Sequence, residues 1–102
     1  MDRDAFEANA TAAGYQIGTS TGTPDKVTHP HAHDYDVRAL IVFGELSITA
    51  NGESHTYRVG DVFDMPSGCV HSERHGPEGS EMVVGRRSAP PRLPAEDEPR
   101  DQ

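Results

Sequence analysis

Three histidines alternate with other residues in the segment THPHAHDYDV, and a fourth follows a proline–glycine turn much later in the chain. They are His29, His31, His33 and His71. Side chains two positions apart on a β-strand point to the same face, so two of these imidazoles could bind one cation. Imidazole nitrogen is a common metal ligand in proteins. The spacing therefore predicts a metal site with a histidine pair on one strand and a third histidine on another.

Glu73 lies two residues beyond His71 and shares its strand parity. Successive same-face residues are roughly 7 Å apart, so Glu73 is expected to be too distant to bind a metal alongside His71 unless the strand bends. We predict that it acts as a general base, or as a hydrogen-bond acceptor for a ligand imidazole. Pairing with Arg74 or Arg86 at the rim is an equally good interpretation.

Two other reactive residues have structural interpretations. Cys69 is the only cysteine, so no intramolecular disulfide can form. We interpret it as a small side chain that fills a turn, with an oxidation-sensitive thiol near the metal as the alternative. His55 lies near an expected hairpin tip and is interpreted as a solvated residue.

The composition restricts the class of partner. The chain has 102 residues and a formal net charge of −8. Nucleic-acid binding normally requires a clustered cationic face, so we exclude a nucleic-acid partner. The sequence has neither a long apolar segment nor a basic amphipathic helix, and its start, MDRDAFEANA, does not resemble a secretion signal. We therefore expect a soluble cytoplasmic protein that does not bind membranes.

The elements that must position the histidines are predicted to be mostly strands. Residues 4–13 are expected to form one short helix, because their apolar residues share a face and Gly14 is a natural stop. Beyond it, short β-prone segments alternate with Gly, Pro, Asn and Asp. The clearest hairpin contains Asn51 and Gly52, which suit a type I′ turn. This pattern indicates an all-β sandwich or barrel.

We divide the chain into three segments within one small domain. We expect residues 1–14 to form the N-terminal helix, residues 15–88 the β-barrel, and residues 89–102 a disordered, acidic, proline-rich tail. The last segment has almost no apolar residues to bury.

A set of residues with fixed spacing runs from Gly60 to His75: Gly60, five residues, Pro66-x-Gly68, two residues, His71, three residues and His75. This set resembles the second motif of the small single-domain cupins of the RmlC-like superfamily, which is G, five residues, P-x-G, two residues, H, three residues and Asn. His75 stands in place of the final Asn. There, His75 is expected to hydrogen-bond the loop that carries the motif.

The first cupin motif is H-x-H, three or four residues, Glu, six residues and Gly. It is matched by His31, His33 and Gly44, but Val37 stands where the glutamate would be. The resemblance implies a double-stranded β-helix, or jelly-roll barrel, in which His31, His33 and His71 bind one divalent transition metal ion. Without the glutamate, three neutral imidazoles suit iron, zinc, nickel or copper, with positions left open for water or substrate.

A second register of the first motif uses His29 and His31 as the pair and Asp36 as the acid. It leaves seven residues before Gly44 and turns Arg38 to the same face as Asp36. We prefer the first register, in which Asp36 and Arg38 point outward and can pair, although a β-bulge would change this parity. The inward residues are then Val37, Ala39, Ile41 and Phe43.

Three functions are compatible with such a site. The first is a metal-dependent enzyme, a dioxygenase or an isomerase-like enzyme acting on a small oxygen-rich molecule, with Glu73 as its base; some cupins that resemble this chain cleave diketones with three histidines. The second is a non-catalytic module that binds or senses a small molecule. The third is a dimerising scaffold. The resemblance also implies a homodimer, and Leu40 and Val42 suit an outer surface covered by a second copy.

Overall fold

The computed structural model describes residues 1–88, so the tail predicted for residues 89–102 lies outside the described residues. One helix is followed by six strands in this range. The elements are α1 (Arg3–Ala12), β1 (Gln16–Gly22), β2 (Val27–His31), β3 (Tyr35–Ala50), β4 (Glu53–Arg58), β5 (Val62–Met65) and β6 (His71–Ser88). Within this range, α1 is too short to span a bilayer and no other helix occurs. The predicted helix and the all-β character are both confirmed.

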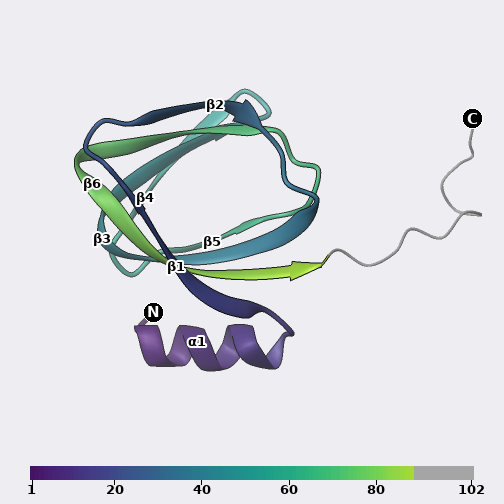
Figure 1. The fold of residues 1–102 in the computed structure, drawn as a ribbon. Helices are drawn as coiled ribbons and strands as arrows, with labels where there is room; N and C mark the ends of the chain where they lie inside the picture. Colours follow the sequence, from purple (N-terminus) through teal and green to yellow (C-terminus); the bar gives the residue numbers. More distant parts are fainter. Residues whose placement is uncertain (89–102) are drawn as a thin grey trace, which may run out of the picture.

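The two long strands, β3 and β6, form the frame of the barrel. They pair antiparallel from Tyr35 opposite Ser88 to Ala50 opposite His71. The first part of β3 also pairs with β5 and its last part with β4, while β6 pairs with β2 and then with β1. Figure 1 shows the strands curling around a barrel, with α1 on its outside. This is the expected jelly-roll arrangement, in which each long strand serves both parts of the barrel.

Two apolar clusters lie on opposite faces of the same strands. The cluster inside the barrel consists of Ala39, Ile41, Leu46, Ile48, Phe63, Met65, Met82 and Val84. The cluster outside consists of Phe6, Ala10, Tyr15, Leu40 and Val83. The apolar runs RALIVF and EMVV are nearly continuous because both faces of β3 and β6 are covered here.

The helix covers the face that we expected a second copy to cover. Leu40 is 1% exposed and packs in one cluster with Phe6 and Ala10 of α1. Val42 is partly buried against the same cluster. The argument for a dimer from Leu40 and Val42 is therefore wrong, since the chain's own helix buries this surface. The homodimer itself stays a prediction.

Arg87 ties the helix to the barrel. One nitrogen of its guanidinium, Nη1, donates to the carbonyl oxygen of Ala13 at 2.7 Å, and Nη2 lies 3.3 Å from Oδ2 of Asp36. The guanidinium also lies 4.4 Å from the centre of the Tyr15 ring. One side chain thus connects the end of α1, the start of β3 and the end of β6.

Phe43 does not point into the barrel as expected, and is 44% exposed. The register of β3 against β6 shifts between Ile41 and Phe43, so that Val42 is an extra residue on β3. Such a β-bulge reverses the alternation of side chains beyond it. Before the bulge, the inward positions of Val37, Ala39 and Ile41 are confirmed.

The replacement of Gly22 by alanine is expected to destabilise the protein by about 1–3 kcal/mol. A methyl group at Gly22 would overlap the imidazole of His75, which is buried and hydrogen-bonded to Ser80. The matched control is Gly18→Ala on the same strand, where the nearest atom is 3.7 Å from the new carbon. Urea unfolding measures both variants, and equal stability of the two would contradict the predicted overlap.

Candidate metal centre

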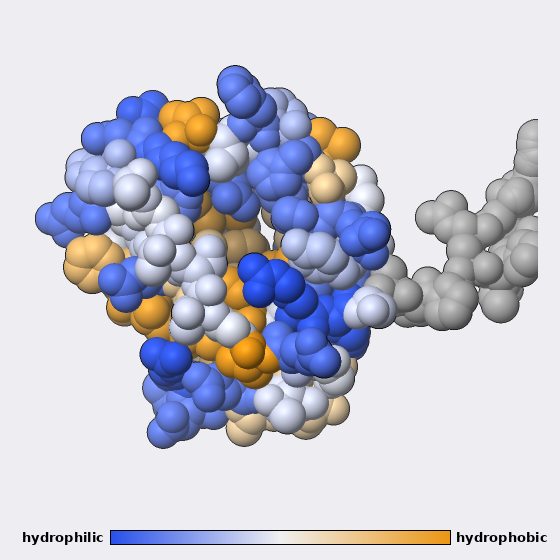
Figure 2. All heavy atoms as spheres, viewed as in Figure 1, coloured by the Kyte–Doolittle hydropathy of each residue, from blue (hydrophilic) through white to orange (hydrophobic). Residues whose placement is uncertain are grey.

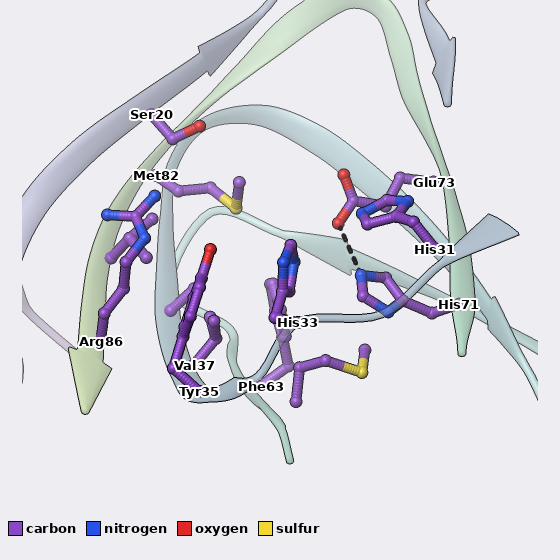
Figure 3. Close-up of a pocket in the computed structure, with 13 residues that line it drawn as sticks. Ser20, His31, His33, Tyr35, Val37, Phe63, His71, Glu73, Met82 and Arg86 are labelled. Atoms are coloured by element: carbon purple, nitrogen blue, oxygen red, sulfur yellow. Dashed lines mark ion pairs between the residues drawn. The ribbon is translucent and has the colours of Figure 1, made fainter. Parts of the chain in front are cut away.

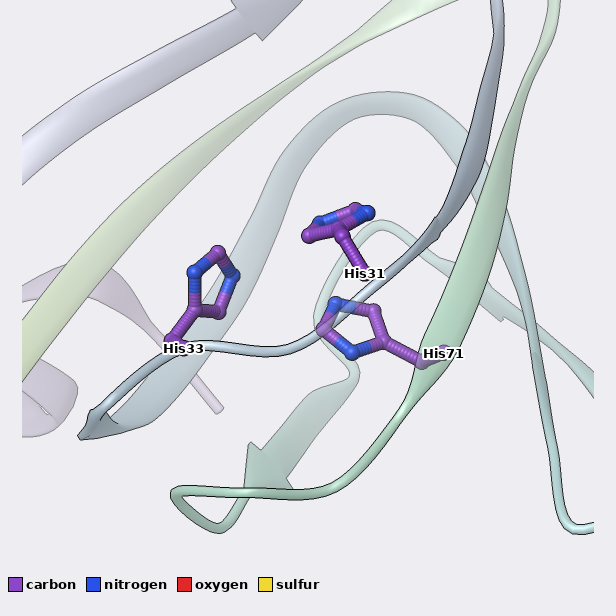
Figure 4. Close-up of side chains that lie close together, drawn as sticks. All are labelled: His31, His33 and His71. Carbon is purple, nitrogen blue, oxygen red and sulfur yellow. The ribbon is translucent and has the colours of Figure 1, made fainter.

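Three histidine side chains converge at one end of the barrel. His31 ends β2, His33 lies in the connection to β3, and His71 begins β6. One ring nitrogen of each lies within 4.8 Å of those of the other two (Figure 4). The centroids of the rings are 4.4 to 5.3 Å apart. The structure therefore brings together the three residues that the sequence predicted, with their nitrogens close enough to share one metal ion.

Strand pairing places two of these histidines opposite each other. β2 pairs with β6 so that His31 faces His71, and Thr28 faces Glu73. Between these two pairs, two residues of β2, His29 and Pro30, lie opposite a single residue of β6, Ser72. The register of the pairing therefore shifts between Thr28 and His31. This irregularity lies where Pro30, which cannot donate a backbone hydrogen bond, interrupts the strand.

Backbone carbonyls orient two of the imidazoles. Nδ1 of His31 lies 2.8 Å from the carbonyl oxygen of His29, and Nδ1 of His71 lies 3.0 Å from that of Cys69. A carbonyl oxygen can only accept, so each Nδ1 carries a hydrogen, and Nε2 is the ring nitrogen that remains available to a metal ion. Hydrogen bonds of this kind fix the ring orientation in known metal sites. The residues present thus fit a metal ion.

The environment of His33 favours the neutral form of its imidazole. Burial lowers the pKa of His33 below its ordinary value, and the neighbouring His71 and His31 lower it further. Its ring also stacks on that of Tyr35, with centroids 4.9 Å apart. A neutral imidazole is the form that binds metals, so the environment of His33 suits a ligand.

Glu73 lies closer to this cluster than its position along the strand predicted. Its Oε2 is 3.4 Å from Nε2 of His71, the nitrogen that faces the site (Figure 3). Its backbone N–H donates to the hydroxyl of Thr28 at 3.2 Å. The carboxylate does not belong to the converging set of three nitrogens, but it can contact a molecule bound beside His71.

The second register of the first motif is not supported. Asp36 accepts a hydrogen bond from the backbone N–H of Ser67 at 2.9 Å, which with Arg87 lowers the pKa of its carboxyl. Arg38 does not pair with Asp36 as expected but donates to Asp64 at 2.7 Å, and His29 is exposed. Asp36 thus stabilises the turn before His71 and is not part of the cluster.

The remaining sequence interpretations have mixed outcomes. His75 does not hydrogen-bond the motif loop; it is buried and its Nδ1 lies 2.6 Å from the hydroxyl of Ser80. Cys69 lies in a turn closed by its N–H to the carbonyl of Pro66 at 3.2 Å, and packs against the barrel core. His55 is exposed, as expected.

The three histidines lie at one side of a cavity of about 170 Å³ inside the barrel. Its walls combine apolar side chains with the three histidines and with four further polar side chains, Ser20, Tyr35, Glu73 and Arg86. On the face seen in Figure 2 the barrel is hollowed, with apolar side chains inside and hydrophilic ones around. Ser20 and Arg86 line the cavity although neither was predicted from the sequence to do so. Arg86, Val84 and Met82 are alternate residues of one strand, and this pattern could have indicated that Arg86 faces the cavity with them.

Comparison with solved structures identifies the fold. The chain is similar to a structural genomics protein of unknown function from Rhizobium leguminosarum bv. viciae (TM-score 0.69, 22% identity, over 76% of this chain and 73% of that one). It is also similar to an RmlC-like cupin from Shewanella frigidimarina (TM-score 0.63, 20% identity, 74% and 67%). A cupin superfamily protein from Desulfitobacterium hafniense gives similar values (TM-score 0.64, 20% identity, 74% and 68%).

Neither a protein-family model nor a curated protein sequence matches the chain. The likeness in structure and the barrel topology nevertheless establish a cupin-fold domain, as the two motifs implied. Within that fold, the described residues hold a cluster of three histidines that could bind a metal ion.

Metal content is expected to fall to near zero when His33 or His71 is replaced by alanine, because two imidazoles do not suffice to retain the ion. Inductively coupled plasma mass spectrometry of protein purified without a histidine tag measures this. His55→Ala, at an exposed position, is the matched control. Full retention of metal in both site variants would exclude the predicted centre.

The metal-free protein is expected to lose stability as the pH falls below about 6.5. Burial lowers the pKa values of His33 and His75 in the folded state. The unfolded chain therefore binds more protons, and this contribution is complete above the unfolded pKa and lost as the pH falls through the folded values. Urea unfolding at several pH values measures it. An unchanged pH dependence in the double variant His33→Asn, His75→Asn would contradict this assignment.

Proposed function

We propose that this protein is a metal-dependent cupin that binds a small oxygen-rich molecule beside an ion held by His31, His33 and His71. The convergence of three imidazoles at a cavity inside the barrel is the observation that supports the proposal. A cavity that combines apolar walls with convergent polar groups is typical of small-molecule sites.

The donor set suits iron, zinc, nickel or copper. Three imidazoles carry no charge, so the bound ion would keep its full positive charge, polarise substrate oxygens and, if it is redox-active, supply dioxygen chemistry. We therefore propose a dioxygenase or an isomerase-like reaction as the enzymatic function.

Residues of the chain provide the surroundings that this chemistry needs. Val37, Phe63 and Met82 line the cavity and exclude water from a bound molecule. The carboxylate of Glu73, with 19% of its side chain exposed, lies next to the metal-facing nitrogen of His71. In this proposal it takes a proton from a molecule bound there, which is the role of a general base.

A non-catalytic module that binds or senses a small molecule is the second candidate. A cupin fold does not decide whether chemistry follows binding. The two candidates differ in a direct assay, which follows oxygen uptake by iron-loaded protein with diketones, catechols and thiols. Product formation with any compound favours the enzyme. A rise in melting temperature without product favours the module.

The replacement Glu73→Gln is expected to lower turnover by roughly 10²- to 10⁴-fold while the metal content is retained, because glutamine keeps the shape but cannot accept the proton. The rate of oxygen uptake and the metal content are measured together. Glu81→Gln, at an exposed position of the same strand, is the control and should keep full activity. Full activity of Glu73→Gln would exclude Glu73 as the base.

A further inference from the structure

We propose that Arg86 binds a carboxylate group of the ligand, so that the ligand class is a small carboxylic acid with further oxygen donors that reach the metal. This inference deepens the proposed function and rests on it.

The register of β3 and β6 places Arg86 directly opposite Val37. Directly opposite residues of an antiparallel pair share a face and lie close enough for their side chains to interact. Val37 stands where the first cupin motif has its glutamate, so no carboxylate projects from that position toward Arg86. Because valine replaces the motif glutamate at position 37, the metal site lacks a carboxylate and the guanidinium of Arg86 lacks an ion-pair partner at the position directly opposite it.

Three other arginines of the barrel form ion pairs within residues 1–88, whereas Arg86 and Arg74 do not, and of these two only Arg86 lines the cavity. Arg38 lies 2.7 Å from Asp64, Arg58 lies 3.4 Å from Glu45, and Arg87 lies 3.3 Å from Asp36. In the part of the chain from residue 1 to 88, Arg86 has no carboxylate within 4.0 Å. Its guanidinium is therefore available to a ligand.

Hydroxyl groups accompany Arg86 on its side of the cavity. The side chains of Ser20, Tyr35 and Arg86 all line it, and Figure 3 shows Tyr35 standing between Arg86 and His33. No hydrogen-bond partner for the hydroxyl of Tyr35 or Ser20 occurs within residues 1–88. A guanidinium fork with nearby hydroxyl donors matches the geometry of a carboxylate, which has acceptors only.

The charge balance of the cavity also favours an anion. A divalent ion on three neutral imidazoles contributes two positive charges and Arg86 a third, against the single negative charge of Glu73. An anionic ligand reduces this excess. Met82 and Val84 form an apolar wall of the same cavity, whose volume of about 170 Å³ limits the ligand to a small molecule. A keto or hydroxy acid has this combination of oxygen donors, carboxylate and short carbon chain.

The test uses 2,4-dioxopentanoate and its methyl ester as probes, because the two share the diketone that binds metals and differ in the carboxylate. Isothermal titration with zinc-loaded protein measures both affinities without turnover. We expect the acid to bind roughly 10- to 100-fold more tightly than the ester, and Arg86→Gln to remove this difference. The variant should keep its zinc and its affinity for the ester.

Two matched variants separate the guanidinium from general charge. Arg74→Gln changes an exposed arginine of the same strand that does not line the cavity, and it should leave the preference for the acid intact. Arg86→Lys keeps the charge but loses the fork, and it should retain only part of the preference. If wild-type protein binds no zinc, the proposed function fails. If zinc binds but acid and ester bind equally, only the role of Arg86 is overturned.

Discussion

The antiparallel pairing of β3 with β6 is the constraint on which the rest of the structure depends. These two strands run the length of the barrel, and every other strand pairs with one of them. Their pairing buries the inner cluster around Ile41 and Met82, and their outer faces support the helix. It also fixes both sides of the cavity, since His71 begins β6 and Arg86 lies close to its end. A barrel of this small size can thus hold two different polar groups at a set separation.

Backbone carbonyls orient the rings of two of the histidines before any ion binds. The acceptors for His31 and His71 both lie two residues earlier in the chain, the first within β2 and the second in the turn before β6. Each carbonyl oxygen fixes which ring nitrogen faces the site. The third histidine has no such hydrogen bond within residues 1–88 and relies on burial and on the stacked ring of Tyr35.

The sequence predicted the barrel and its three histidines because both depend on local patterns. Glycine and proline mark the turns, and His31, His33 and His71 occupy the histidine positions of the cupin motifs. The expected placement of the histidine pair on one strand is wrong, because His31 ends β2 and His33 lies in the connection to β3. The position of Phe43 could not be predicted, because a bulge depends on how two distant strands pair. The position of Arg86 opposite Val37 depends on the same register, which a single sequence does not reveal.

The shared contacts of Asp36 have a mechanical consequence. One of its carboxylate oxygens accepts a hydrogen bond from the backbone N–H of Ser67, in the turn that leads to His71. The other contacts Arg87, which donates a hydrogen bond to the carbonyl oxygen at the end of α1. The N-terminal helix and the loop before the third histidine therefore share one rigid connection, although they are far apart in sequence. Displacement of α1 would weaken the contact of Arg87 with Asp36, and with it the turn that positions the imidazole of His71. A segment outside the barrel thus helps to keep the donor geometry inside it.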